Sequence, residues 1–231
     1  MFLKKRDIIC VPYRNRPDQL TTFLNDSSHL FDKHLPGSKV VIVEQSQNKP
    51  FNRGMLLNIG FTHFYESMKH FFTHDVDINP TDKCVKEMYT LPVKSDCVLG
   101  IYTSVHDTLG GIIKLQRDTF KKMNGFPNNF WGWGVEDRAL QNRATFHGIS
   151  KQTCLLNDKP HDDYILRFDD TQDRVMIHLD KKSNFHYNVF QHLTREKQQE
   201  SVEHSGLNNL EYSILYEKEI VDHVHHMIVD I

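Results

Sequence analysis

Short apolar runs of strand character alternate with amphipathic helical segments over the first eighty residues, and this alternation restricts the possible folds most strongly. The runs DIICV at 7–11, KVVIVE at 39–44 and HFFTH at 70–74 predict buried strands. Apolar residues at helical spacing over 19–35 and 51–68 predict helices between them. Strands joined in this way by helices are typical of a parallel sheet covered by helices. The expected fold class is α/β, with a Rossmann-like central, mostly parallel sheet flanked by helices.

The alternation weakens after residue 80. Residues 81–110 have the composition of irregular strands and loops, and 125–134, rich in glycine, asparagine and aromatic residues, predicts a structured loop. The other expected elements are a strand at 112–116, helices at 117–124 and 136–146, and a tail from Asp169 that returns to the sheet. Because no repeat, low-complexity tract or linker interrupts the sequence, we expect one domain spanning residues 1–231.

Composition argues against several classes of function. The net charge of −2 is too small for a protein that binds nucleic acid by bulk electrostatics. No apolar run approaches the roughly 20 residues of a membrane helix, and the first residues lack the apolar core of a secretory signal. We therefore expect a cytoplasmic or otherwise soluble chain. Its cysteines are expected to be free thiols, with a bridge between Cys84 and Cys97 as the main exception.

Two acids, Asp75 and Asp77, follow the third expected strand. Ligands of open parallel sheets bind beyond the carboxyl ends of the strands, and carboxylates two residues apart on extended backbone point to the same side. Such a pair suits a hard divalent cation that bridges phosphate oxygens. The alternative is a plain turn, which Asp and Asn commonly form at strand ends.

Both tryptophans of the chain lie in the segment WGWGVED at 131–137. Glycine lets the backbone approach a ligand, and an indole face can cover a sugar ring. Asp137, beside these aromatic residues, is a candidate general base. The alternative is that the acids at this helix start only balance the helix dipole.

Met176 and His178 would share one face of a strand and could both reach one ion. The alternative is stronger here, because most of the 15 histidines, including His223, His225 and His226, are expected to be ordinary surface or core residues.

Arginines and a phenylalanine stand where a phosphate group could bind. Arg14 and Arg16 follow the first strand, and Phe51 and Arg53 stand at the start of the second helix. Arginine forks bind phosphate bidentately, a helix N-terminus adds its dipole, and a phenylalanine ring can stack on a base. Taken separately, solvated surface arginines are the stronger explanation.

In chain order, these segments resemble the β-1,4-galactosyltransferase family, whose members are inverting, metal-dependent enzymes with the GT-A glycosyltransferase fold. PYRNR, FNRGMLLNIGF and HDVDINP are similar to the family's P-F-R-N-R, F-N-R-A-x-L-L-N-x-G-F and H-D-V-D-x-x-P. GGIIKLQRDTFKKMNGFPNNFWGWGVED is similar to the segment that ends W-G-W-G-G-E-D-D, and MIHLDKKSN resembles the metal-binding segment. The C-terminal part of the chain, from SGLNNLEYSILY to the final VDI, resembles the family's C-terminal ending. The resemblance therefore runs from the first strand to the last residue.

The resemblance implies a site for a UDP-sugar and for Mn²⁺ as cofactor. The residues that would contact the donor are Pro12, Arg14, Arg16, Phe51, Arg53, Asp75, Val76, Gly111 and Trp133. Asp77, Met176 and His178 would ligate the metal ion. The segment 179–193 would close over the site after metal and donor bind, and so complete the acceptor site.

The implied reaction moves a hexose, galactose first, from the UDP-sugar to a sugar hydroxyl of a glycan or glycoconjugate. It is a single in-line displacement with inversion. Glu136 would hydrogen-bond a sugar hydroxyl, and Asp137 would accept the proton of the attacking hydroxyl. The implied partners are a UDP-sugar donor and a carbohydrate or glycoprotein acceptor, without nucleic acid or a membrane span.

The sequence departs from the family pattern at several of these positions. Val135 and Arg138 stand where the family usually has Gly and Asp, beside the acceptor hydroxyls. Met-x-His is shorter than the Met-x-x-His of lactose-type members and matches the His-x-His spacing of the xylosylprotein branch. Thr108 replaces a larger Tyr of galactose-specific members, which leaves UDP-GalNAc or UDP-GlcNAc as alternative donors.

Two functions of other kinds stay open. One is a catalytically silent UDP-sugar-binding protein, although none of the expected catalytic or donor-binding residues is missing from the sequence. The other is a metal-dependent hydrolase of nucleotide sugars, in which water attacks at an open acceptor site. Family members are usually anchored in the Golgi through a stem, so either a soluble enzyme or one domain of a larger protein fits this sequence.

Overall fold

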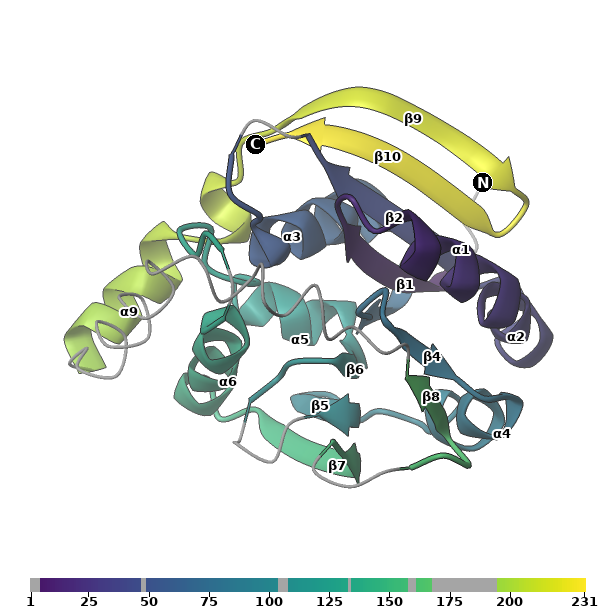
Figure 1. The fold of residues 1–231 in the computed structure, drawn as a ribbon. Coiled ribbons are helices and arrows are strands. Elements are labelled where there is room, and N and C mark those ends of the chain that lie inside the picture. Colours follow the sequence, from purple (N-terminus) through teal and green to yellow (C-terminus); the bar gives the residue numbers. More distant parts are fainter. Residues whose placement is uncertain (1–4, 47–48, 104–107, 133, 158–160, 168–194) are drawn as a thin grey trace.

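A central sheet of eight strands organises the computed structural model, which describes residues 5–46, 49–103, 108–132, 134–157, 161–167 and 195–231. The strand order is β7-β5-β6-β3-β1-β2-β10-β9, and a second sheet pairs β4 with β8. In Figure 1 the large sheet runs from β7 at the bottom to the β9–β10 hairpin at the top. Four of its seven pairings are parallel, which agrees with the expected mostly parallel sheet.

The strands are β1 (Arg6–Tyr13), β2 (Lys39–Gln45), β3 (Met68–Thr73), β4 (Ile78–Pro80), β5 (Cys97–Thr103), β6 (Ile112–Gln116), β7 (Ser150–Leu156), β8 (Ile165–Arg167), β9 (Ser213–Val221) and β10 (Val224–Asp230). The helices are α1 (Pro17–Asp26), α2 (Ser28–His34), α3 (Arg53–Phe64), α4 (Asp82–Cys84), α5 (Arg117–Lys122), α6 (Glu136–Phe146) and α9 (Arg195–His204). Short 3₁₀ turns at Tyr65–Ser67 and Leu207–Asn209 and a π turn at Val85–Tyr89 complete the described elements.

The β1, β2, β3 and β6 strands and the α3, α5 and α6 helices occur where the sequence patterns predict them, with ends shifted by a few residues. The single helix expected over 19–35 is wrong, because α1 and α2 are separate helices that meet at Ser27. Ser27 is fully buried, and its hydroxyl donates to Asn79 Oδ1 at 3.3 Å. This tertiary hydrogen bond lies at the break between the two helices.

The segment 81–110, expected to be irregular, contains the fully buried strand β5. Gly100 interrupts the apolar run of β5, and a Cβ on this residue would lie 2.8 Å from Thr103 Cγ2. The tail does return to the sheet, but through the α9 helix and the β9–β10 hairpin. All four cysteines are free, so the expected thiols are confirmed and the alternative bridge does not form.

Helices cover both faces of the large sheet, and alternate residues of β1 point into two cores. Ile9 and Val11 belong to the cluster that includes residues of α1 and α2, whereas Ile8 and Cys10 belong to the cluster that includes residues of α3, α5 and α6. Gly60 permits α3 to approach β1 closely, because a Cβ there would lie within 2.4 Å of Cys10 Sγ. Strands buried on both faces explain why their sequences are continuous apolar runs.

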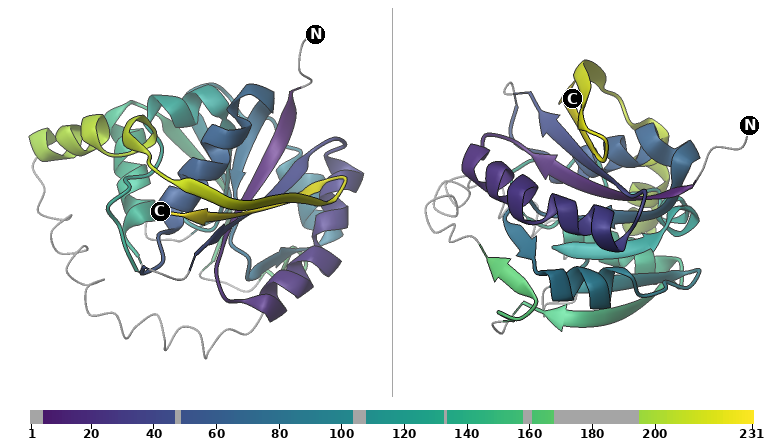
Figure 2. Two further views of the ribbon diagram at one scale, coloured as in Figure 1. Left: turned by 90° about the horizontal axis from the view of Figure 1, so that it is seen from above. Right: turned by 90° about the vertical axis from the view of Figure 1, so that its right-hand side faces the viewer.

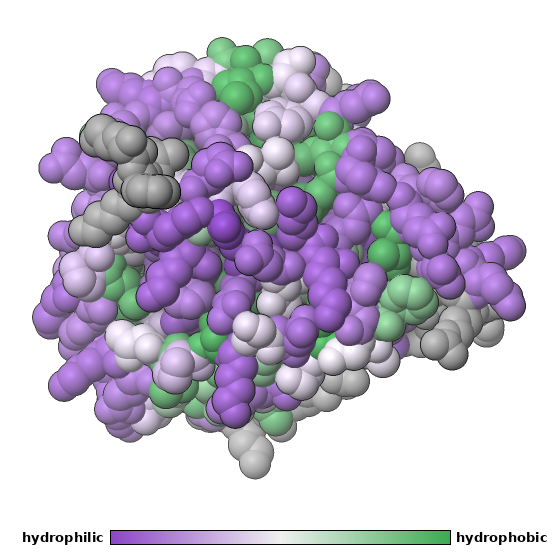
Figure 3. All heavy atoms as spheres, turned by 180° about the vertical axis from the view of Figure 1, so that it is seen from behind, coloured by the Kyte–Doolittle hydropathy of each residue, from purple (hydrophilic) through white to green (hydrophobic). Residues whose placement is uncertain are grey.

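The face opposite to that of Figure 1 is mostly hydrophilic, with small apolar groups scattered over it (Figure 3). Figure 2 shows the β9–β10 hairpin crossing the molecule alongside β2. Among the described helices, none combines the length and apolar character that crossing a bilayer requires.

Candidate functional site

The backbone that follows β3 carries the two acids of the expected metal site. β3 is a central strand between β1 and β6. His74 is fully buried, and its Nδ1 lies 2.9 Å from the Asp75 carbonyl oxygen while its Nε2 lies 2.8 Å from Tyr89 Oη. Burial lowers the pKa of His74 to about 4, so the imidazole is neutral near pH 7. Because a carbonyl only accepts, Nδ1 donates and Nε2 accepts, and both bonds hold the turn that presents Asp75 and Asp77.

Arg53 lies between acids from two different parts of the chain. It is the first residue of α3, whose N-cap Asn52 accepts a hydrogen bond from the Met55 N–H at 3.0 Å. Arg53 Nε donates to Asp75 Oδ1 at 2.8 Å, and Nη1 lies 3.6 Å from Glu136 Oε1. The Nη1 atom is buried and makes no hydrogen bond within the described part of the chain. A buried guanidinium donor without an acceptor is a suitable partner for a phosphate or hydroxyl oxygen.

The acids around Arg53 give the site a surplus of negative charge. Burial, reinforced by the charge of Asp137, raises the pKa of Glu136 to about 7 although Arg53 opposes the shift. Burial also raises the pKa of Asp75, again against Arg53. Burial disfavours the charge of Arg53 itself, but Asp75 and Glu136 outweigh it and raise its pKa. One guanidinium among three carboxylates leaves an electrostatic environment that favours a bound cation.

The loop after β1 brings its two arginines to the same edge of the sheet, where they make different contacts. Arg16 Nη1 donates to Asp77 Oδ2 at 3.1 Å, and both side chains are partly exposed. Arg14 Nη1 donates to the Lys49 carbonyl at 2.6 Å, and its guanidinium carbon lies 5.3 Å from the centroid of the Phe51 ring. Arg14 and Phe51 thus lie together, as a stacking and phosphate-binding role would require.

Two of the expected donor residues lie within the packed interior. Pro12 is a buried residue of β1 that stands opposite Val43 of β2. Val76 is buried in the apolar cluster on the α1–α2 face of the sheet. A contact between Val76 and a nucleotide would therefore be made by its backbone.

The glycine pair before β6 lies directly against the start of α6. Gly111 has a φ of +74°, and a Cβ there would lie 2.3 Å from the Tyr102 carbonyl oxygen, so this position requires glycine. A Cβ on Gly110 would lie 2.7 Å from Asp137 Oδ2. The Leu109 N–H also donates to the Asp137 carbonyl at 3.2 Å. The candidate base therefore stands beside the residue pair expected near the donor sugar.

Val135, the N-cap of α6, directs Glu136 and Asp137 into the site from a strained backbone. Its φ of +78° is in the left-handed region, which a β-branched residue rarely adopts. Its buried side chain packs in a small cluster with Phe130 and Ala139. The glycine of the family pattern at this position is the sequence signal for the left-handed conformation.

Sequence reasoning overlooked the side chain that ties the loop before α6 to α3. Asn58 is fully buried; its Nδ2 donates to the Phe126 carbonyl at 2.8 Å, and its Oδ1 accepts from the Phe126 N–H at 2.9 Å. A Cβ on Gly125 would lie 2.3 Å from Asn58 Oδ1. The detectable signal was an asparagine in the otherwise apolar helix segment MLLNIGF, since a buried amide needs partners.

Several expected site residues, namely Trp133, Met176, His178 and the segment 179–193, lie outside the described residues. The neighbouring Gly132 N–H donates to the Phe51 carbonyl at 2.7 Å, which places this segment beside the start of α3. Thr108, the residue expected to govern the choice of donor, is buried, and its carbonyl accepts from Lys151 Nζ at 3.1 Å.

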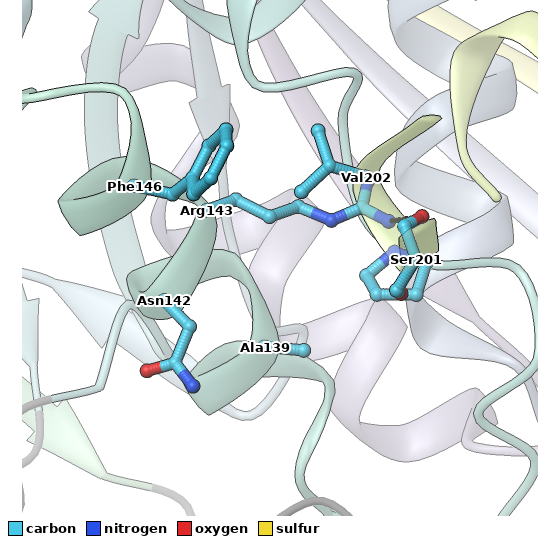
Figure 4. Close-up of a pocket in the computed structure, with 7 residues that line it drawn as sticks. Ala139, Asn142, Arg143, Phe146, Ser201 and Val202 are labelled. Atoms are coloured by element: carbon cyan, nitrogen blue, oxygen red, sulfur yellow. Dashed lines mark hydrogen bonds between the residues drawn. The ribbon is translucent and has the colours of Figure 1, made fainter. Parts of the chain in front are cut away.

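A small pocket lies between α6 and α9, away from these groups. Its lining residues are Pro127, Ala139, Asn142, Arg143, Phe146, Ser201 and Val202. Figure 4 shows Arg143 extending from α6 toward Ser201, whose carbonyl accepts from Nη2 at 2.8 Å. Arg143 Nη1 donates to the Gly125 carbonyl at 2.8 Å. Because its charged group is engaged with backbone carbonyls, Arg143 holds α9 against the loop before α6.

Two family models match most of the chain. The N-terminal region of glycosyl transferase group 7 matches residues 3–91, and a galactosyltransferase domain model, described as N-terminal, matches residues 98–178. The chain belongs to the β-1,4-galactosyltransferase family. The first match includes Arg14, Arg16, Arg53, Asp75 and Asp77, and the second includes Glu136 and Asp137.

Curated members of the β-1,4-galactosyltransferase family align with most of this chain. Zebrafish (Danio rerio) β-1,4-galactosyltransferase 5 is 32% identical over 216 residues, which are 90% of this chain and 52% of that protein. Bovine (Bos taurus) β-1,4-galactosyltransferase 1 is 28% identical over 217 residues, which are 90% of this chain and 50% of that protein. The chain thus spans about half the length of these relatives.

The fold is that of a solved member of the β-1,4-galactosyltransferase family. The structure of a mutant Drosophila β-1,4-galactosyltransferase 7 with manganese, UDP-Gal and xylobiose superposes with a TM-score of 0.73. The match has 23% sequence identity and covers 98% of this chain and 93% of that chain. This similarity confirms the expected GT-A fold.

Proposed function

We propose that residues 1–231 form a single GT-A catalytic domain that transfers galactose from UDP-Gal to a sugar hydroxyl with inversion. The observation that carries the proposal is the meeting of four separate segments at one edge of the sheet. Arg53 contacts Asp75 and lies near Glu136, and Asp137 packs against Gly110. A cationic donor, carboxylates and a glycine-lined surface are what a nucleotide-sugar site needs.

The described residues fit the metal ion that the family uses. Asp77 offers a carboxylate oxygen at the end of a central strand, a ligand type that suits Mn²⁺. Asp75, Glu136 and Asp137 add the negative surplus noted above. Mn²⁺ held by Asp77 with Met176 and His178 would balance the charge on the departing diphosphate.

In the proposed reaction the acceptor oxygen bonds to the anomeric carbon of galactose while the bond from that carbon to the UDP oxygen breaks. Asp137 receives the proton of the acceptor hydroxyl, and UDP leaves with the bonding electron pair. Glu136 has a pKa of about 7, so its protonated form can donate a hydrogen bond to a sugar hydroxyl near neutral pH. Arg14, Arg16 and Arg53 hold the diphosphate, and Phe51 packs on the uracil.

The choice of acceptor to test first is supported by the family relationship and not by the described residues. The Drosophila relative was solved with xylobiose, and the Met-x-His spacing of this chain matches the spacing of the xylosylprotein branch. We therefore infer a xylose-terminated acceptor as the first to test, with N-acetylglucosamine and glucose as comparisons. UDP-GalNAc is the second donor, because Thr108 is smaller than the tyrosine of galactose-specific members.

The test is a panel of UDP-Gal, UDP-GalNAc, UDP-GlcNAc and UDP-Glc with each acceptor, with Mn²⁺ or with EDTA, measuring UDP release and the disaccharide product. We expect Mn²⁺-dependent product from UDP-Gal with at least one acceptor. UDP release that does not depend on acceptor would instead identify a hydrolase. UDP binding without turnover under any condition would identify a binding protein, and absence of UDP binding would overturn the proposal.

A further inference from the structure

The far end of α3 carries a second group of side chains able to bind a metal ion. His63 lies near the C-terminal end of α3, Glu217 in the middle of β9 and His225 near the start of β10. One ligand atom from each lies within 4.8 Å of the others. His63 stands ten residues after Arg53, which is about 15 Å along the helix axis. The group is therefore well separated from the acids around Arg53.

The three side chains converge on a single oxygen atom. His63 Nε2 and His225 Nε2 each lie 2.8 Å from Glu217 Oε1. The His225 Nε2 atom is buried, and apart from this ion-pair contact with Glu217 it has no hydrogen-bond partner among the described residues. The ring of Phe64 packs edge-on against the His225 imidazole with centroids 5.1 Å apart, which holds the orientation of that ring.

We propose that His63, Glu217 and His225 form a binding site for Zn²⁺ or a similar transition-metal cation. Two imidazoles and one carboxylate are a common protein ligand set for zinc, with a fourth position left to water. At metal–ligand distances of about 2.0–2.1 Å, neighbouring ligand atoms of a tetrahedral shell lie about 3.3 Å apart. The two distances from the imidazole nitrogens to Glu217 Oε1, now 2.8 Å, must therefore increase by only about 0.5 Å. Small rotations of these partly exposed side chains are sufficient for this change.

The lysine near the cluster is engaged with a different acid. Lys39 is the nearby cation on β2, and its Nζ is paired with Glu219 Oε1 at 2.7 Å. Its charge is therefore partly balanced. A bound ion would connect α3 to the β9–β10 hairpin (Figure 1) at the edge of the sheet.

The test uses Zn²⁺ as probe and the 231-residue chain without a histidine tag. The parent protein carries Asp77→Asn, which removes the carboxylate ligand of the proposed Mn²⁺ site and so weakens metal binding there. We expect one Zn²⁺ per chain in competition with a chromophoric chelator, and at least tenfold weaker binding after His225→Gln or His63→Gln. His226→Gln is the matched control, because His226 is the next residue on β10 and pairs instead with Glu44 at 2.8 Å.

Two further measurements separate loss of a ligand from loss of folding. Thermal unfolding without metal should be similar for the parent protein and His63→Gln, and added Zn²⁺ should raise the Tm of the parent but not of Glu217→Gln. Co²⁺ should give the visible absorption of a tetrahedral site with the parent and with His226→Gln, but not with Glu217→Gln. Equal Zn²⁺ affinity for the parent and both folded histidine variants, or no Zn²⁺ bound by the parent, would overturn the proposal.

Discussion

The two ends of α3 each place a basic side chain against acids, but they differ in burial and in the origin of their partners. At the first end, Arg53 is 12% exposed and its partners come from the segment after β3 and from the start of α6. At the second end, His63 is 26% exposed and meets Glu217 on the edge hairpin. The first cluster lies at the carboxyl ends of central strands, where several loops converge, and the second lies where water is available.

This difference separates the energetic roles of the two clusters. Removing one member of a buried ion pair leaves another charge desolvated, whereas an exposed pair contributes little to folding. The Arg53 cluster therefore carries a stability cost that a bound donor and cation would relieve. The His63 cluster has little effect on the free energy of unfolding without a metal ion, and it stabilises the fold only when a cation is bound. The predictions below test this contrast.

The largest expected effect is on turnover at the Arg53 end. Asp137→Asn should lower the transfer rate by roughly two to four orders of magnitude, because an amide cannot accept the acceptor's proton. UDP affinity should be unchanged, which equilibrium binding would show. The control is Asp118→Asn, which removes an exposed acid at the start of α5 and should leave kcat unaltered. Comparable kcat for both variants would remove Asp137 from the mechanism.

The next largest effect is on stability. Arg53→Leu should lower the free energy of unfolding by about 3–5 kcal/mol, because it leaves Asp75 and Glu136 buried without their cation. His63→Gln, at the other end of the same helix, should cost less than about 1 kcal/mol in metal-free buffer. Denaturant titration of both variants measures the difference. Similar losses at the two ends would contradict the contrast between the clusters.

A third prediction concerns the pH dependence of Glu136, measured in EDTA without donor. Its pKa rises from 4.5 to about 7 on folding, so the folded state retains a proton that the unfolded state releases. The contribution of Glu136 to the free energy of unfolding is fully present below pH 4.5 and is lost as the pH rises through about 7. Glu136→Gln should therefore be more stable than the wild type above pH 7, by on the order of 3 kcal/mol. A difference that stays constant from pH 5 to pH 8 would contradict the shift.

The smallest expected effect is at Val135. Val135→Gly should change the free energy of unfolding by less than about 1 kcal/mol, because relief of the strained left-handed backbone offsets the lost apolar contacts. The matched control is Val202→Gly in α9, where exposure is 8% against 7% for Val135 and the backbone is helical. The control should lose about 2–3 kcal/mol, since no strain is relieved there. Equal losses would show that Val135 is unstrained.

Prediction from the sequence succeeded where the signal is local. Apolar runs located β1, β2 and β3. Asp75 and Asp77 follow β3 directly, and their role in the candidate site stays a prediction. Prediction failed at Ser27, because the apolar periodicity predicts one continuous helix there. In the structure two helices meet at Ser27, and its buried hydroxyl donates to Asn79. Prediction also failed at β5, because an interior glycine and the lack of a following helix made a buried strand look irregular.

The sequence by itself determined the fold class, the family and the chemical types of the candidate residues, because these depend on short-range patterns and on motifs in a given order. Only the tertiary structure decided that Arg53 lies between Asp75 and Glu136, that Asp137 packs on Gly110, and that Val135 adopts a left-handed backbone. Likewise, His63, Glu217 and His225 meet only after the hairpin joins β2. Distances between residues far apart in sequence arise from the packing of whole elements, which no local pattern encodes.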